Sequence, residues 1–161
     1  MKKQSIVLSG GGILPPKYLI LVLRLALGWL FIQSAYTKLS ATAGWSASGY
    51  LSQSVGPLSG WFHGLAGNGT LDGVVMIGEL LIGIALVLGA ATRFTALAGS
   101  AMMLLFYAAK LPPAGTWVNQ QLIYLVVLNV LAAAKAGTFY GLDGLLQGVE
   151  KRVPALKYVL G

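Results

Sequence analysis

The amino-acid sequence predicts an all-α integral membrane protein: a four-helix bundle with both termini in the cytoplasm and an extracytoplasmic loop between the first two helices. Hydrophobic residues make up 57% of the 161 residues and charged residues only 9%, whereas an average soluble domain is about a quarter charged. The apolar residues gather in four long runs, and the basic residues flank these runs. Composition, segmentation and charge placement therefore all indicate that lipid surrounds the chain.

The apolar runs divide the chain into an N-terminal arm at 1–16, a transmembrane domain at 17–146 and a C-terminal cytoplasmic tail at 147–161. Crossing ~30 Å of hydrocarbon takes about 20 helical residues. The expected spans lie at about 18–39, 73–91, 94–111 and 117–134. The first run could alternatively be a signal peptide cleaved near residues 40–43, but its length and the embedded Arg24 favour a span.

The orientation follows from the basic residues at the ends of the runs. If both termini are cytoplasmic, the outer side holds only Lys38 and Lys110. The inner side then holds Lys2, Lys3, Lys17, Arg93, Lys135, Lys151, Arg152 and Lys157. This asymmetry is the positive-inside pattern. The loop at 40–71 is then extracytoplasmic, and because it is aromatic and uncharged we expect it to cap the membrane surface, with a short interfacial helix inside it.

Composition also limits the chemistry. The chain has no cysteine and a single histidine, His63, so we expect no protein-bound metal or haem. The net charge of +7 comes from residues at helix ends, without a basic and aromatic patch, so we expect no nucleic-acid partner. Electron transfer would therefore need a diffusible carrier such as a quinone, or a partner subunit that holds the redox centre.

Three ionisable residues in or near the spans are the candidate catalytic residues: Arg24, Lys38 and Glu79. Arg24 and Lys38 share one stripe of the first helix at alternating spacings of four and three residues. The sequence leaves open whether Glu79 pairs with Lys38 or with Arg24. A buried pair could simply fix helix packing, or it could form a pocket whose cations bind an anionic or quinone oxygen while Glu79 accepts a proton.

Four polar residues of the third and fourth runs are candidates for binding a quinone: Tyr107, Asn119, Gln120 and Tyr124. Their alternative roles are structural, because amides hydrogen-bond between membrane helices and tyrosines anchor helices at the interface. Asp143, which follows the fourth run, is expected to cap a helix in the tail.

Several short motifs together resemble the DoxX/DoxD family, over nearly all of residues 18–146. They are Arg24-Leu25-Ala26-Leu27-Gly28 with Lys38-Leu39, the segment Gly78–Gly89 followed by Thr92-Arg93, Gly137 through Gly141-Leu142-Asp143, and Ala66-Gly67-Asn68 in the outer loop. The resemblance implies a four-helix membrane protein similar to the DoxD subunit of thiosulfate:quinone oxidoreductase. That enzyme oxidises thiosulfate to tetrathionate and reduces a membrane quinone, with DoxA as a smaller partner subunit.

A family resemblance predicts the fold more reliably than it predicts the reaction. The alternative is a non-catalytic accessory subunit packed within a larger respiratory or other redox complex. The expected partners are membrane lipid, quinone, and either other subunits or further copies of this chain.

Overall fold

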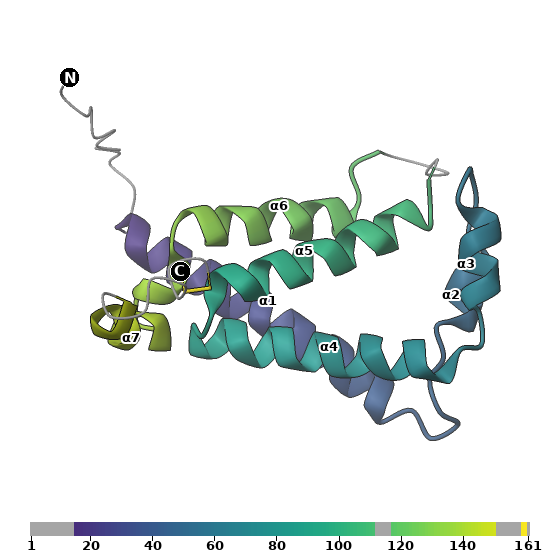
Figure 1. Ribbon diagram of the computed structural model, residues 1–161, viewed down its shortest axis with the longest axis horizontal. Coiled ribbons are helices and arrows are strands. Elements are labelled where there is room, and N and C mark those ends of the chain that lie inside the picture. The colour runs from purple at the N-terminus through teal and green to yellow at the C-terminus, as the bar shows by residue number, and fades with distance from the viewer. Residues whose placement is uncertain (1–14, 112–116, 151–158, 161) are drawn as a thin grey trace.

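The computed structural model describes residues 15–111, 117–150 and 159–160, and within these residues the chain is helical and has no strand. Four long helices lie side by side, two short helices cover one end, and a 3₁₀ turn with a further helix lies at the other (Figure 1). In chain order these are α1 (Pro16–Leu39), α2 (Ser48–Leu51), α3 (Ser59–Leu65), α4 (Gly69–Leu88), α5 (Thr92–Ala108), α6 (Gln120–Ala133), η1 (Ala136–Thr138) and α7 (Leu142–Glu150). The remaining residues are not described: 1–14 of the N-terminal arm, 112–116, which include the turn between the third and fourth runs, and 151–158 and 161 of the tail.

Two of the long helices, α1 and α4, are long and apolar enough to cross a membrane. The other two are shorter, with 17 residues in α5 and 14 in α6. Capping residues determine where α4 starts and stops. The side chain of Asn68 accepts hydrogen bonds from the first turn, and Gly89 ends the helix in the left-handed conformation at φ 64°.

The backbones of α1 and α4 approach each other closely at two facing glycines, Gly28 and Gly83. A Cβ on Gly83 would lie 2.8 Å from the carbonyl oxygen of Gly28, and a Cβ on Gly28 would lie 3.0 Å from that of Gly83. Any larger residue at either position would push the two backbones apart. Around this contact α1 buries the stripe that its spacing predicts, which includes Arg24, Phe31 and Ala35.

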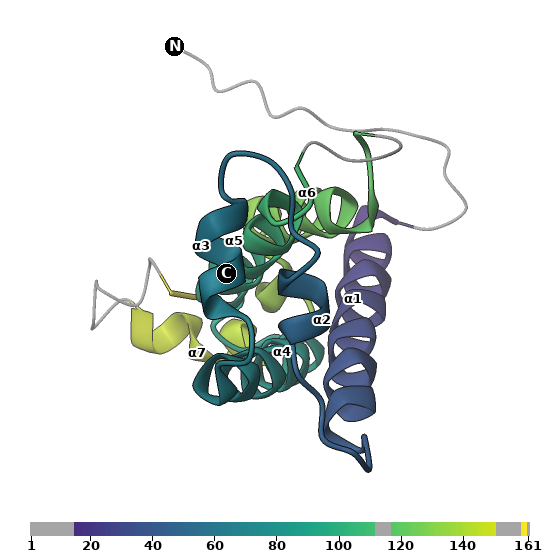
Figure 2. The ribbon, with the colours of Figure 1, turned by 90° about the vertical axis from the view of Figure 1, so that its right-hand side faces the viewer.

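The loop between α1 and α4 folds back over the end of the bundle, which faces the viewer in Figure 2. The sequence predicts one short helix in this loop, and the structure contains two, α2 and α3. The carboxylate of Asp72 in α4 accepts a hydrogen bond of 2.8 Å from the backbone N–H of Ala47. The hydroxyl of Tyr50 donates one of 2.7 Å to the carbonyl of Phe106 in α5. These bonds hold the aromatic loop against the ends of α4 and α5.

Candidate functional site

A cavity of about 800 Å³ lies between the long helices at the end covered by α2 and α3. Residues of α1, α4, α5 and α6 form its walls, and Trp45, Tyr50, Trp61 and Phe62 of the loop between α1 and α4 form its cover. Most of the lining is aliphatic or aromatic. Polar groups reach the cavity at a few defined places, which is the usual composition of a small-molecule site.

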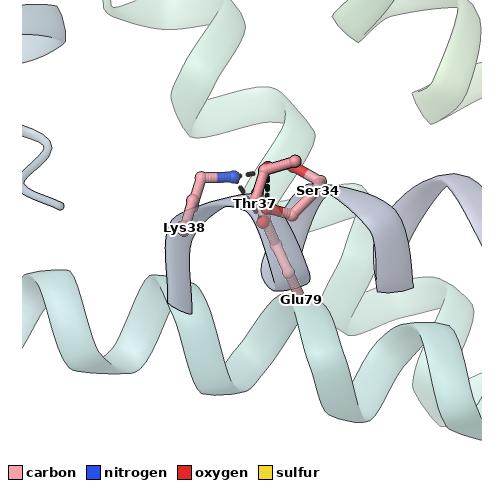
Figure 3. Close-up of polar contacts among 4 residues, drawn as sticks. All are labelled: Ser34, Thr37, Lys38 and Glu79. Carbon is pink, nitrogen blue, oxygen red and sulfur yellow. Dashed lines mark hydrogen bonds and ion pairs between the residues drawn. The ribbon is translucent and has the colours of Figure 1, made fainter. Parts of the chain in front are cut away.

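The most polar wall is an ion pair between α1 and α4. Nζ of Lys38 lies 2.5 Å from Oε2 of Glu79 and 2.7 Å from Oγ of Ser34 (Figure 3). The side chain of Glu79 is 4% exposed and that of Lys38 is 16% exposed. The ammonium group also lies 5.2 Å from the ring centroid of Trp45. Three contacts therefore fix the position of Lys38, and both members of the pair line the cavity.

A second polar wall comes from the start of α6. Nε2 of Gln120 donates a hydrogen bond of 2.8 Å to the hydroxyl oxygen of Tyr124, and both residues line the cavity together with Gln121. The Tyr124 ring packs at a tilt against Phe31 of α1, with the centroids 6.5 Å apart. Amide and hydroxyl groups are thus available on a second side of the cavity.

Two of the predicted quinone-binding residues do not line the cavity. The hydroxyl of Tyr107 donates to the carbonyl of Trp117, 3.0 Å away. The side chain of Asn119 accepts a bond of 3.1 Å from the N–H of Leu122 and so caps α6. Several polar lining residues are absent from the predicted set: Gln33, Ser34, Thr37, Ser46 and Gln121. Ser34 could have been found from the sequence, because it precedes Lys38 by four residues on the same helix face.

Arg24 lies far from the ion pair, in the N-terminal half of α1. Lys38 follows Arg24 by 14 positions, which is about 21 Å along an α-helix. Of the two pairings that the sequence leaves open, the structure therefore contains Lys38–Glu79. The guanidinium of Arg24 is buried and donates to three backbone carbonyls: those of Ala136 at 2.6 Å, Phe139 at 3.1 Å and Tyr140 at 3.2 Å.

Asp143 corrects one expectation. Its carboxylate does not simply cap its own helix: it accepts hydrogen bonds from the N–H groups of Ala91 at 2.6 Å and Thr92 at 2.8 Å, at the start of α5. Its own N–H donates to the carbonyl of Gly89 at 2.9 Å. The residue caps a helix that starts about fifty positions earlier in the chain, so local sequence does not reveal its partner. Arg24 and Asp143 together attach the segment after α6 to α1 and to the α4–α5 turn.

The cover of the cavity contains one ionisable group with a shifted pKa. Burial raises the pKa of the Tyr50 hydroxyl above its ordinary value. The group therefore stays neutral and continues to donate its hydrogen bond to α5 well into the alkaline range.

The family model for DoxX matches residues 19–110, which is more than half of the chain. The chain belongs to the DoxX family. The match to the DoxX model contains Lys38, Glu79 and the covering loop, whereas Gln120 and Tyr124 lie beyond it. No curated protein and no solved structure matches the chain. DoxX proteins are membrane-associated, in agreement with the two apolar helices that are long enough to cross a bilayer.

Proposed function

We propose that this DoxX protein is a multi-pass protein of the cell membrane in which α1, α4, α5 and α6 all cross the bilayer, with both termini in the cytoplasm. The placement of the basic residues supports this orientation. The shorter helices α5 and α6 lie alongside α1 and α4 (Figure 1), so a bilayer that surrounds α1 and α4 would also surround α5 and α6. Their outward residues, such as Leu97, Leu104 and Val126, are apolar and exposed, as lipid-facing residues must be.

We further propose that the outer cavity binds a membrane quinone and that the chain is a subunit of a thiosulfate:quinone oxidoreductase. The observation that carries this proposal is the Lys38–Glu79 pair in the wall of an otherwise apolar cavity. A quinone is flat, neutral and largely apolar, and its carbonyl oxygens accept hydrogen bonds. Lys38 can donate to such an oxygen, and Glu79 can exchange protons with it.

The reaction requires both protons and electrons at this site. Reduction of a quinone to a quinol consumes two electrons and two protons, and oxidation of two thiosulfate ions to tetrathionate releases two electrons. Glu79, which accepts a hydrogen bond from Lys38, would pass protons to the ring oxygen. Lys38 would bind that oxygen and stabilise the negative charge that develops on it.

Thiosulfate fits the cavity less well than a quinone does. The charge of Lys38 is balanced by Glu79 at 2.5 Å, so a dianion would meet a neutral pair in apolar surroundings. Arg24 is bonded to backbone carbonyls at the other end of α1. We therefore assign thiosulfate binding to a partner subunit or to the interface with one, which makes the active form a hetero-oligomer.

Binding and turnover can be tested separately on the full chain in lipid nanodiscs. A quinone analogue should quench the fluorescence of Trp45 and Trp61, which line the cavity. Lys38→Ala should weaken the quenching, whereas Lys17→Gln, which removes a cation from the opposite end of α1, should leave it unchanged. With the partner subunit present, thiosulfate should reduce the quinone. A folded protein that neither binds the analogue nor turns over would rule out the proposal.

A second candidate function is that of an accessory subunit of a larger redox complex. Its support is a shallow groove on the outward face of α4, lined in part by Gly69, Gly73 and Gly78, where the backbone of a partner helix could approach closely. This function predicts stable co-purification with a large redox complex, loss of that association in Gly73→Leu, and no turnover by the isolated chain.

A further inference from the structure

Helix α7 runs across the bundle axis. Figure 1 shows the long helices from the side and α7 nearly end-on, at the end opposite α2 and α3. Figure 2, turned by 90°, shows α7 from the side as it projects away from the bundle. If the long helices cross the bilayer, α7 therefore lies roughly parallel to the membrane plane.

The outward side of α7 is apolar. Leu142, Leu145 and Leu146 follow the spacing of one helix face and are 41%, 80% and 42% exposed. By contrast, the carboxylate of the neighbouring Asp143 is fully buried against the α4–α5 turn. A helix at a water-facing surface would bury its leucines and expose its acid. This helix does the reverse, as expected where the outer medium is hydrocarbon.

The residues before α7 place it at the level of the lipid headgroups. The ring of Tyr140 stacks on that of Tyr18 in the first turn of α1, with the centroids 6.1 Å apart. Nζ of Lys17 lies 5.0 Å from the centroid of the Tyr18 ring. Tyrosine and lysine concentrate at the membrane–water interface. Since α7 begins two residues after Tyr140, it starts at this depth.

The charges around α7 match an anionic lipid surface. Lys17 and Lys135 are exposed at this end of the bundle, and in the sequence α7 is followed directly by Lys151 and Arg152. Basic residues near the cytoplasmic face attract anionic phospholipid headgroups. Leucines on one side of a helix with cations beside it form the usual composition of an interfacial helix.

We propose that α7 is an in-plane membrane anchor that inserts Leu142, Leu145 and Leu146 into the cytoplasmic leaflet among anionic phospholipids. The burial of Asp143 fixes the roll of the helix so that these leucines point away from the bundle. The proposal rests on the proposed crossing of the bilayer by the long helices, and it is independent of quinone binding.

The absence of cysteine from the sequence makes spin labelling a direct test. Single-cysteine variants Leu145→Cys, Leu97→Cys and Ser52→Cys of the full chain are labelled with a nitroxide in vesicles of phosphatidylglycerol and phosphatidylcholine. Leu97 is the lipid-facing control on α5, and Ser52, exposed in the outer loop, is the water-facing control. We expect the Leu145 label, like the Leu97 label, to be relaxed several-fold more by oxygen than by a water-soluble nickel chelate, and the Ser52 label to show the reverse.

The remaining outcomes overturn the proposal in distinguishable ways. A Leu145 label that behaves like the Ser52 label places α7 in water. A Leu145 label shielded from both reagents means that protein, such as a second copy or another subunit, covers the helix. A Leu97 label that behaves like the Ser52 label would contradict the proposal that the long helices cross the bilayer. In vesicles of phosphatidylcholine alone, the oxygen preference at Leu145 should fall; an unchanged value would eliminate the role of anionic lipid.

Discussion

The two halves of α1 each hold a cation, Arg24 and Lys38, in opposite kinds of surroundings. Arg24 is enclosed by backbone: three carbonyls accept its hydrogen bonds, and Gly89 and Gly141 pack against its guanidinium. Lys38 pairs with the carboxylate of Glu79, both residues line an open cavity, and the side chain of Lys38 stays partly exposed. A buried charge whose neighbourhood is filled by the protein acts on structure, whereas one that adjoins empty volume can act on a ligand. Burial alone does not separate these roles.

The largest effect is expected from removing the guanidinium of Arg24, which the backbone encloses. Arg24→Ala leaves three carbonyls without their donor and removes a positive charge that interacts with Asp143, so we expect a loss of about 3–5 kcal/mol in the free energy of unfolding. Thermal unfolding in detergent measures this loss. Arg24→Lys should recover only part of it, because an ammonium group does not present the planar fork of a guanidinium. Unfolding of Arg24→Ala at the wild-type temperature would contradict a structural role.

The open end should respond in activity more than in stability. Glu79→Gln keeps a hydrogen-bond acceptor for Lys38 but removes the exchangeable proton, so quinone reduction should fall about 100-fold, with a smaller loss of stability than in Arg24→Ala because Lys38 keeps some exposure. The rate of thiosulfate-dependent quinone reduction by the assembled complex provides the measurement. Lys17→Gln is the control at the other end of α1. A wild-type rate for Glu79→Gln would exclude proton transfer through this residue.

A smaller loss of stability is expected at Gly137, where an added methyl group tests how tightly the residues around Asp143 are packed. A Cβ on Gly137 would overlap the carboxylate of Asp143 and the hydroxyl of Thr92, so Gly137→Ala should cost about 1–3 kcal/mol in unfolding free energy. Gly64→Ala in α3 is the matched control, because no atom lies within 4 Å of the added methyl group. If both variants have equal stability in detergent, the packing of Gly137 against Asp143 and Thr92 is looser than the distances indicate.

The smallest effect concerns pH and the cavity cover. The folded-state pKa of Tyr50 is raised by burial above the unfolded value of about 10. Its hydrogen bond to Phe106 therefore stabilises the protein fully below pH ~10 and is lost as the pH rises through the folded pKa. The difference in unfolding temperature between wild type and Tyr50→Phe should thus be constant below about pH 10 and shrink as the pH rises above that value. A difference independent of pH would show that Tyr50 does not titrate on unfolding.

The sequence predicts the helical class and the buried stripe of α1 because apolar periodicity is a local property. It also identifies Lys38 and Glu79 as candidates, since charges are rare in apolar runs. It does not choose between Lys38 and Arg24 as the partner of Glu79, because that choice depends on how α1 is placed against α4. The partners of Asp143 are missed for the same reason, and the predicted site includes Tyr107 and Asn119 because residue type does not reveal which of them faces the cavity.

The contact between Gly28 and Gly83 has a consequence for how the cavity can change size. With their backbones so close and the side chains of Val87 and Ile32 packed against the two glycines, α1 and α4 have little room to shift at that level, so they form a rigid unit. Helix α6 touches α1 at only a few positions, although it packs extensively on α5. If the proposed quinone enters from the bilayer, we therefore expect α6 to move away from α1 and to open the seam between Phe31 and Tyr124.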